Sequence, residues 1–172
     1  MIVVTGGDGF IGSNIIKAVK EKITKDVLCV DYTNKRQNSR WCHPDDFLRY
    51  GEHFRNIEVI FHNGANSSTT ASNVFDVMHK NFDYPATLLL RCIRDNVKFI
   101  YASSASVYGD GPFKEGSPKQ PKNLYAKSKA AFDDYAGIFS TSKGLITGLR
   151  YYNVYGRNEE FKGDMASIVY KF

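Results

Sequence analysis

A tyrosine and a lysine four residues apart are the first pair in this sequence that can do chemistry. Tyr125 and Lys129 lie in a stretch with helical spacing, so both side chains fall on one face of a helix, within reach of each other. A nearby ammonium group favours phenolate over phenol. We therefore expect Lys129 to lower the pKa of Tyr125 and to let it act as an acid or base on a substrate hydroxyl near neutral pH.

A serine at the end of a predicted strand complements this pair. Ser103 and Ser104 directly follow the apolar run 98–102. Ligands of open parallel sheets bind beyond the carboxyl ends of the strands, where a serine can hydrogen-bond the oxygen that Tyr125 deprotonates. Ser104 is the first choice for this role and Ser103 the second. A Tyr-x-x-x-Lys pair that lacks such a strand end beside it most often lies on the protein surface without a catalytic role.

A glycine-rich turn predicts a binding site for a dinucleotide. Glycines at positions 6, 7, 9 and 12 separate an apolar run from a helical pattern. Such a backbone approaches a pyrophosphate closely, and the start of the helix offers free N–H groups and the positive end of its dipole. Asp31 ends the next apolar run, where an acid accepts hydrogen bonds from the adenosine ribose. The expected site comprises Gly6, Gly9, Phe10, Ile11, Gly12, Asp31 and Tyr32.

Two basic residues bear on which dinucleotide is bound. Lys35 and Arg36 follow Asp31 closely, where a 2′-phosphate would lie. They favour NADP, with NAD as the alternative, and solvated surface is an equally good interpretation of the pair.

The elements that position these residues follow from the apolar runs. Short runs alternate with helical patterns, which is typical of a parallel sheet covered on both faces. The expected fold class is α/β, a Rossmann-like doubly wound parallel sheet with helices on both faces. The expected strands are Ile2–Thr5, Val27–Val30, Val59–His62, Lys98–Ala102 and Leu145–Leu149, and the expected helices cover about 11–25, 44–53, 72–96 and 125–139. We expect loops without a strand over 32–43 and 109–123.

Composition narrows the function classes. The 172 residues are 42% hydrophobic and 24% charged with a net charge of +5, which suits one globular core and excludes a disordered chain. No apolar run approaches a membrane span, and no basic–aromatic pattern indicates nucleic acid. The three cysteines and four histidines lack metal-ligand spacing, so we expect no metal site. We expect the cysteines to be free thiols. No secretory signal is visible, and we expect a cytoplasmic protein.

Several strings resemble a known family. The glycine turn, serine, tyrosine and lysine resemble the extended branch of the short-chain dehydrogenases/reductases, the NAD-dependent epimerases and dehydratases of nucleotide sugars. Within it, the strings SSTT (67–70), YNVYG (152–156) and KGDMAS (162–167) are similar to the ADP-L-glycero-D-manno-heptose 6-epimerases. The resemblance covers nearly the whole chain, and these strings are more specific than the glycine turn.

The resemblance implies an activity and further site residues. It implies an NADP-dependent epimerisation of ADP-heptose or a similar nucleotide sugar, by oxidation at C6 and reduction from either face. Tyr125 and Lys162 would be the two acid/base groups, with Ser104 beside Tyr125, and Lys129 would hold the nicotinamide ribose. The remaining implied contacts are Asn63, Gly64, Ala65 and Asn81 for the cofactor, and Ser67, Asn153 and Asp164 for the substrate. We also expect a homo-oligomer.

Departures from the family leave alternatives open. Its members are much longer, so residues 1–150 are interpreted as the dinucleotide-binding domain and 151–172 as the start of an incomplete substrate region, the C-terminal substrate domain being largely absent. The chain is then a piece of a longer protein or a naturally short relative. Asp164 replaces a serine near the substrate, and an acid beside a diphosphate is unfavourable. The alternatives are a catalytically weak dinucleotide-binding or oligomerising module and a related 4-epimerase or 4,6-dehydratase.

Overall fold

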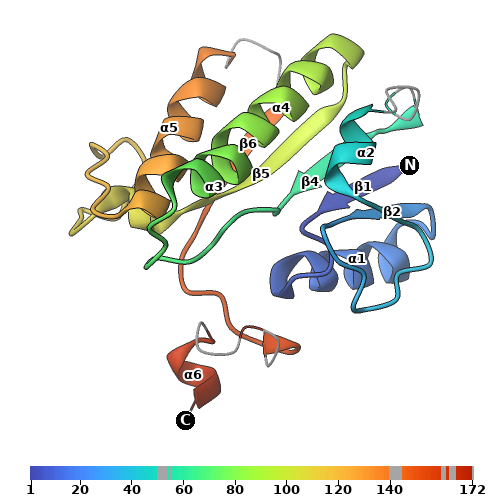
Figure 1. The fold of residues 1–172 in the computed structure, drawn as a ribbon, viewed down its shortest axis with the longest axis horizontal. Coiled ribbons are helices and arrows are strands. Elements are labelled where there is room, and N and C mark those ends of the chain that lie inside the picture. Colours follow the sequence, from blue (N-terminus) through green and yellow to red (C-terminus); the bar gives the residue numbers. More distant parts are fainter. Residues whose placement is uncertain (50–53, 55, 140–144, 160–161, 163–165, 172) are drawn as a thin grey trace.

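A six-stranded sheet, with every neighbouring pair of strands parallel, forms the centre of the protein (Figure 1). The computed structural model describes residues 1–49, 54, 56–139, 145–159, 162 and 166–171. The strands are β1 (Ile2–Thr5), β2 (Val27–Val30), β3 (Trp41–Cys42), β4 (Val59–His62), β5 (Lys98–Ser104) and β6 (Ile146–Tyr151), in the order β3-β2-β1-β4-β5-β6. The order reverses between β1 and β4, and open sheets of this type bind ligands in the crevice at that point.

The short strand β3 corrects the sequence analysis, which expects no strand between Tyr32 and His43. Trp41 pairs with Cys29, and Cys42 pairs with Val30. The pairing is completed by two backbone bonds, from the Cys29 N–H to the Arg40 carbonyl (3.0 Å) and from the Asp31 N–H to the Cys42 carbonyl (3.2 Å). Two residues are too few for an alternating pattern, so only the tertiary pairing reveals this strand.

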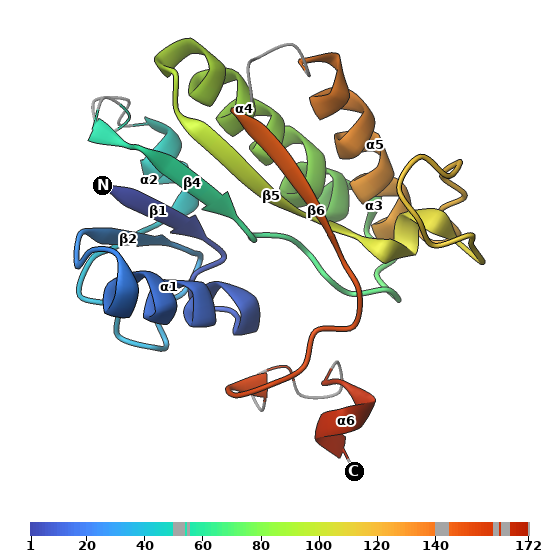
Figure 2. The ribbon, with the colours of Figure 1, turned by 180° about the vertical axis from the view of Figure 1, so that it is seen from behind.

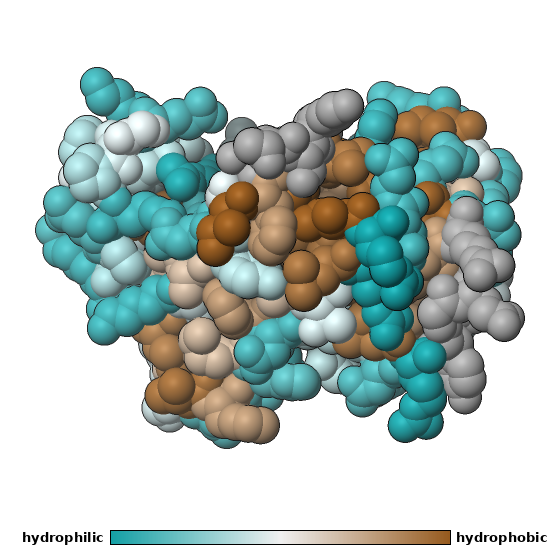
Figure 3. Space-filling view, turned by 90° about the horizontal axis from the view of Figure 1, so that it is seen from above, coloured by the Kyte–Doolittle hydropathy of each residue, from teal (hydrophilic) through white to brown (hydrophobic). Residues whose placement is uncertain are grey.

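Helices cover both faces of the sheet, as predicted, but unevenly. Helix α1 (Phe10–Lys22) lies on one face, where Ile16 and Val19 pack on β1 and β2. On this side no helix of the described chain covers β5 and β6 (Figure 2). Leu149 of β6 is accordingly 38% exposed. Seen from above, hydrophobic side chains also reach the surface between hydrophilic flanks (Figure 3).

The opposite face carries the larger core. It is covered by α2 (Pro44–Arg49), α3 (Val74–Met78), α4 (Tyr84–Asp95) and α5 (Leu124–Ile138) (Figure 1). Phe47, Leu88, Leu89 and Phe132 from these helices pack on buried residues such as Phe99 of β5. The expected helix 44–53 reaches Arg49, and positions 50–53 lie outside the described residues.

The predicted helix 72–96 is continuous but contains a wider turn. The π-helical segment η2 (His79–Asp83) joins α3 to α4, and Asn96 ends α4 in the left-handed conformation with a φ of 55°. Such π turns occur frequently at functional sites. Here the turn places the buried side chain of Asn81 beneath the ligand-binding end of the sheet.

After β6 the chain leaves the sheet and ends in the short helix α6 (Ile168–Lys171), well away from the strands (Figures 1 and 2). The predicted loop 109–123 is found between β5 and α5, preceded by a 3-10 turn, η3 (Ala105–Tyr108). Cys29, Cys42 and Cys92 are free thiols, as expected. None of the described helices combines the length and apolar character needed to cross a bilayer.

Candidate active site

A cleft runs along the carboxyl ends of the strands and gathers most of the predicted site residues. Its predicted lining residues are Gly6, Gly9, Phe10, Ile11, Gly12, Asp31, Tyr32, Lys35, Arg36, Asn63, Gly64, Ala65, Ser67, Ser104, Tyr125, Lys129, Asn153 and Lys162. Two predicted residues are not among them. Asn81 lies beneath the cleft, and Asp164 falls outside the described residues.

The glycine turn packs so tightly that side chains are excluded at two positions. Gly6 has a φ of +66°, and a Cβ there would lie 2.6 Å from the Gly64 nitrogen. A Cβ on Gly12 would lie 2.1 Å from the Gly6 carbonyl oxygen. No side chain caps α1, and its first turn contains no acid. The free N–H groups and the positive dipole end of α1 therefore fit a pyrophosphate in the cleft.

Asp31 stands where the adenosine ribose is expected. One carboxylate oxygen accepts a hydrogen bond from the Asp8 N–H (2.9 Å), and the other accepts one from the Tyr32 N–H (2.7 Å). Burial, aided by the charge of Asp8, raises the pKa of Asp31, although these hydrogen bonds act in the opposite direction. A carboxylate held in this way can accept ribose hydroxyls with its remaining lone pairs.

Asp8, which sequence reasoning did not single out, fixes the loop after β2. Its carboxylate accepts hydrogen bonds from the Thr33 hydroxyl and from the backbone N–H groups of Lys35 and Arg36. Both basic residues line the cleft. The sequence feature that could have indicated this role is an acidic residue inside the glycine turn, with a polar loop after the next strand.

The turn after β4 is anchored to β1 by a buried pair. The Thr5 hydroxyl oxygen lies 2.6 Å from Nδ1 of His62 and accepts a 3.3 Å hydrogen bond from the Gly64 N–H. Complete burial, with a smaller effect from Lys129, lowers the pKa of His62 to about 3. The histidine is therefore neutral and structural, and it holds the Asn63–Ala65 turn beside Gly6.

Asn81 holds the next part of this loop from below. Its amide oxygen accepts from the Asn66 N–H (2.7 Å), and its nitrogen donates to the Asn66 carbonyl (3.0 Å) and to the Ser128 hydroxyl (2.9 Å). Ser128 in turn donates to the Tyr125 carbonyl (2.7 Å). Asn81 thus links the loop that carries Ser67 to the helix that carries Tyr125, a positioning role that its resemblance-based assignment did not include.

Ser104 and Tyr125 lie together at one end of the cleft. Ser104 caps η3, and its hydroxyl oxygen accepts bonds from the Ser106 N–H (3.2 Å) and hydroxyl (2.9 Å). Burial raises the pKa of Tyr125, while a hydrogen bond with the Ser104 side chain acts to lower it. The preferred serine of the sequence analysis is therefore the one in contact with the tyrosine.

The expected effect of Lys129 on Tyr125 is not found. The ammonium group donates a 2.8 Å hydrogen bond to the Ala102 carbonyl and lies 6.0 Å from the centre of the tyrosine ring. Lys129 is 5% exposed, and this burial lowers its pKa to about 8 against the opposing charge of Asp133. The hydrogen bond to β5 and the desolvation of the helix face, neither visible in the spacing, explain the difference.

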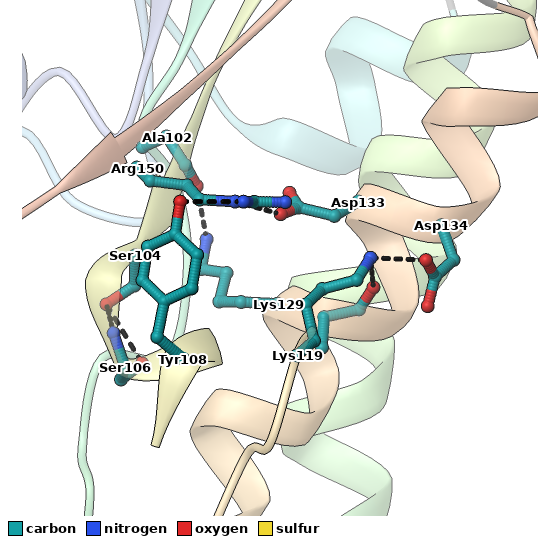
Figure 4. Close-up of polar contacts among 10 residues, drawn as sticks. Ala102, Ser104, Ser106, Tyr108, Lys119, Lys129, Asp133, Asp134 and Arg150 are labelled. Carbon is teal, nitrogen blue, oxygen red and sulfur yellow. Dashed lines mark hydrogen bonds and ion pairs between the residues drawn. The ribbon is translucent and has the colours of Figure 1, made fainter. Parts of the chain in front are cut away.

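A partly buried guanidinium ties together three elements of the wall that carries Ser104 and Tyr125 (Figure 4). Arg150 of β6 donates from Nε to Asp133 of α5 (2.9 Å) and from Nη1 to the Tyr108 hydroxyl of η3 (2.8 Å). The guanidinium carbon also lies 4.9 Å from the centre of the Tyr108 ring. η3 begins at Ser104, so Arg150 holds the Ser104 turn against the tyrosine-bearing helix. No sequence motif indicated this contact.

Lys162 closes the cleft from the C-terminal segment. Its ammonium group donates to Glu159 (3.3 Å) and lies 5.2 Å from the centre of the Phe10 ring at the start of α1. Glu159 is fully buried and also accepts from the Ser167 N–H (2.6 Å) and hydroxyl (3.0 Å). These bonds outweigh the effect of burial and lower the pKa of Glu159. The carboxylate thus holds Lys162 beside the glycine turn.

Fold and site together define a Rossmann-type α/β protein whose cleft places a serine, a tyrosine and a lysine beside a glycine-rich turn. Residues 2–172 match the NAD dependent epimerase/dehydratase family, and the chain belongs to that family. Solved structures similar to this chain include epimerases of nucleotide sugars, as the resemblance implied.

Solved structures agree with this assignment. The ADP-L-glycero-D-manno-heptose-6-epimerase of Helicobacter pylori is 30% identical with a TM-score of 0.85, over 99% of this chain and 60% of that one. The UDP-N-acetylglucosamine 4-epimerase of Methanobrevibacter ruminantium is 28% identical with a TM-score of 0.82, over 98% and 59%. The UDP-glucose 4-epimerase of Thermus thermophilus, in complex with NAD, is 30% identical with a TM-score of 0.75, over 91% and 56%. The chain therefore spans about 60% of the length of these relatives.

Proposed function

We propose that this chain carries the dinucleotide-binding and catalytic part of a nucleotide-sugar epimerase, with ADP-D-glycero-D-manno-heptose as the substrate. The observation that carries the proposal is the convergence, in one cleft, of the glycine turn with Ser104, Tyr125 and Lys129. The strings 67–70, 152–156 and 162–167 support the choice of sugar. A nicotinamide dinucleotide, when bound, would accept a hydride from the sugar and return it.

Tyr125 and Ser104 act together on the hydroxyl at the reacting carbon. Ser104 hydrogen-bonds the substrate oxygen and orients it, and Tyr125 exchanges the proton with that oxygen. The raised pKa of Tyr125 keeps it a phenol at neutral pH, which suits the step that returns a proton. Lys129, with a pKa of about 8, supplies positive charge to this wall in its protonated form.

Lys162 acts as the second acid/base group in this proposal. It reaches the cleft from the C-terminal segment, whereas Tyr125 comes from α5, so the two enter from different elements. Glu159 orients it by hydrogen bonding. Asn153 and Ser67 line the same cleft and contact the sugar in this proposal. A homo-oligomer and a cytoplasmic location also remain part of the proposal.

The test starts with the purified 172-residue chain. Any nucleotide released on denaturation is identified by mass spectrometry, and ADP-heptose is then supplied and the product resolved by chromatography. We expect Tyr125→Phe to lower turnover by about 100- to 10,000-fold, the usual contribution of a general acid/base, with unchanged dinucleotide binding. Tyr135→Phe on the same helix is the matched control, since Tyr135 packs on Phe82 and Phe139 and does not line the cleft.

The outcomes separate the proposal from its alternatives. A folded chain that binds a dinucleotide but leaves ADP-heptose unchanged indicates the weak dinucleotide-binding module. Turnover of UDP-sugars alone indicates a 4-epimerase or dehydratase. A folded chain that binds no dinucleotide overturns the proposal.

A further inference from the structure

The loop after β2 is folded onto the glycine turn by one carboxylate. Oδ2 of Asp8 accepts from the Thr33 hydroxyl (2.6 Å) and the Lys35 N–H (2.9 Å), and Oδ1 accepts from the Arg36 N–H (2.8 Å). Arg36 Nε also donates to the Asp8 carbonyl (3.0 Å). Successive backbone N–H groups that point to one spot form an anion-binding concavity. In this protein an internal carboxylate fills that concavity.

The carboxylate in this concavity is charged at neutral pH. Partial burial acts to raise its pKa, but the hydrogen bonds from Thr33, Arg36 and Lys35 prevail and hold the pKa below its ordinary value. The Asp8 N–H donates to Asp31, so a second carboxylate lies next to the first. Two acids therefore stand together at the end of β2, where the ribose of the dinucleotide is expected.

NAD and NADP differ only at the 2′ position of the adenosine ribose, which carries a hydroxyl in NAD and a phosphate in NADP. The 2′-hydroxyl of NAD can donate to Asp31, whereas the 2′-phosphate of NADP brings close to two negative charges that need donors. The loop's backbone donors are already bonded to Asp8. The Lys35 side chain is exposed, so its charge is screened by water. The charge of the Lys35–Arg36 pair, the reason to expect NADP from the sequence, is thus opposed by two carboxylates.

We propose that Asp8 is a specificity-determining residue that makes this cleft select NAD over NADP. Asp8 occupies the donors that a 2′-phosphate would require and repels it by charge. The inference rests on the proposed function, because it concerns the dinucleotide of the same cleft. It replaces NADP by NAD as the expected cofactor.

Direct binding tests the inference without an activity assay. Isothermal titration calorimetry of the 172-residue chain compares NAD with NADP, and 5′-AMP with 2′,5′-ADP as minimal probes of the 2′ position. We expect the wild-type chain to bind NAD about tenfold or more tighter than NADP, the ratio that one strong charge contact near a protein surface can produce. The preference is expected to shrink with added salt.

Variants separate the charge of Asp8 from its hydrogen bonds. We expect Asp8→Ala, which empties the concavity, to shift the ratio of NADP to NAD affinity, and of 2′,5′-ADP to 5′-AMP affinity, by about tenfold toward the phosphorylated ligand. Asp8→Asn keeps the size and one acceptor, so it shifts the ratio in the same direction by less, and it decides the test if Asp8→Ala does not fold. Asp110→Ala is the matched control: it removes the same charge from the exposed loop after η3.

The outcomes distinguish the two proposals. Tighter binding of NADP by the wild-type chain, or an unchanged NAD:NADP ratio in both Asp8 variants, overturns the role of Asp8 and leaves the dinucleotide site standing. An equal shift in Asp110→Ala also overturns it, since net charge alone then explains the preference. Failure of every variant to bind either dinucleotide overturns the proposed function and the role of Asp8 with it.

Discussion

The two walls of the cleft are held by different kinds of contact. On the wall formed by β1, α1 and the turn after β4, backbone atoms approach one another so closely that glycine is required at Gly6 and Gly12. On the wall formed by β5, η3 and α5, side chains cross between elements, as Arg150 does to Asp133 and Tyr108. A backbone-built wall tolerates almost no added atom, whereas a side-chain network weakens one bond at a time.

The largest expected effect breaks the backbone-built wall. Gly12→Val places a branched side chain where a Cβ already meets the Gly6 carbonyl at 2.1 Å. We expect a loss of about 3 kcal/mol or more in the free energy of unfolding, and no dinucleotide binding, because overpacked backbone must move. Denaturant unfolding and calorimetry measure both.

Gly137→Ala is the control for this prediction. Gly137 lies in α5, and a Cβ there has no neighbour within 4 Å. We expect a gain of about 0.5–1 kcal/mol, because alanine loses less conformational freedom in a helix. Comparable destabilisation by the two substitutions would show that the glycine turn is not specially constrained.

A smaller effect is expected from opening the side-chain wall. Arg150→Met leaves Asp133, 6% exposed, without its guanidinium. We expect a loss of about 2 kcal/mol in the free energy of unfolding, because Asp133 loses a charged hydrogen-bond donor but keeps its hydrogen bond with the Tyr101 side chain. Tyr108→Phe removes a single hydrogen bond and is expected to cost about 1 kcal/mol.

A readout beyond stability tests whether Arg150 positions Ser104. If it does, Arg150→Met lowers kcat well below the level of Tyr108→Phe, with unchanged binding of dinucleotide to the opposite wall. Equal kcat values for the two variants at matched stability would leave Arg150 a purely structural residue.

The smallest expected effect is a slope in the pH dependence of stability. The pKa of Lys129 is about 8 in the folded chain and about 10.4 when unfolded. Below pH 8 Lys129 is protonated in both the folded and the unfolded chain, so folding carries the full cost of burying its charge. Between about pH 8 and pH 10.4, the two pKa values, Lys129 is protonated in the unfolded chain and increasingly neutral in the folded one. The free energy of unfolding therefore rises with pH, by at most about 1.4 kcal/mol per pH unit.

Lys129→Met removes this slope. The difference in the free energy of unfolding between wild type and Lys129→Met, measured against pH, therefore gives the contribution of Lys129 alone. Cys29 and Cys92, whose pKa values burial raises to about 12, contribute equally to both proteins. Lys127→Met, at an exposed position of the same helix, leaves the slope in place. Parallel curves for wild type and Lys129→Met from pH 7 to 10 would contradict the buried, partly neutralised lysine.

Much of the fold and of the cleft could be predicted because both depend on local patterns. The runs 2–5, 27–30 and 59–62 are long enough to show their apolar character, and glycine spacing marks the turn directly. The strand Trp41–Cys42 could not be predicted, because its only support is the backbone of β2. The contacts of Asn81 and Arg150 could not be predicted either, because their partners are 15 or more residues away.

The sequence by itself determined the α/β class, the glycine turn and many of the residues that line the cleft, since residue type and spacing suffice for these. Tertiary structure decided the electrostatics. Burial, and not its spacing from Lys129, dominates the pKa of Tyr125, and the fold of the loop after β2 turns Asp8 toward the donors beside Asp31. Charge strength depends on solvent exposure and on distant partners, and a chain acquires both only when it folds.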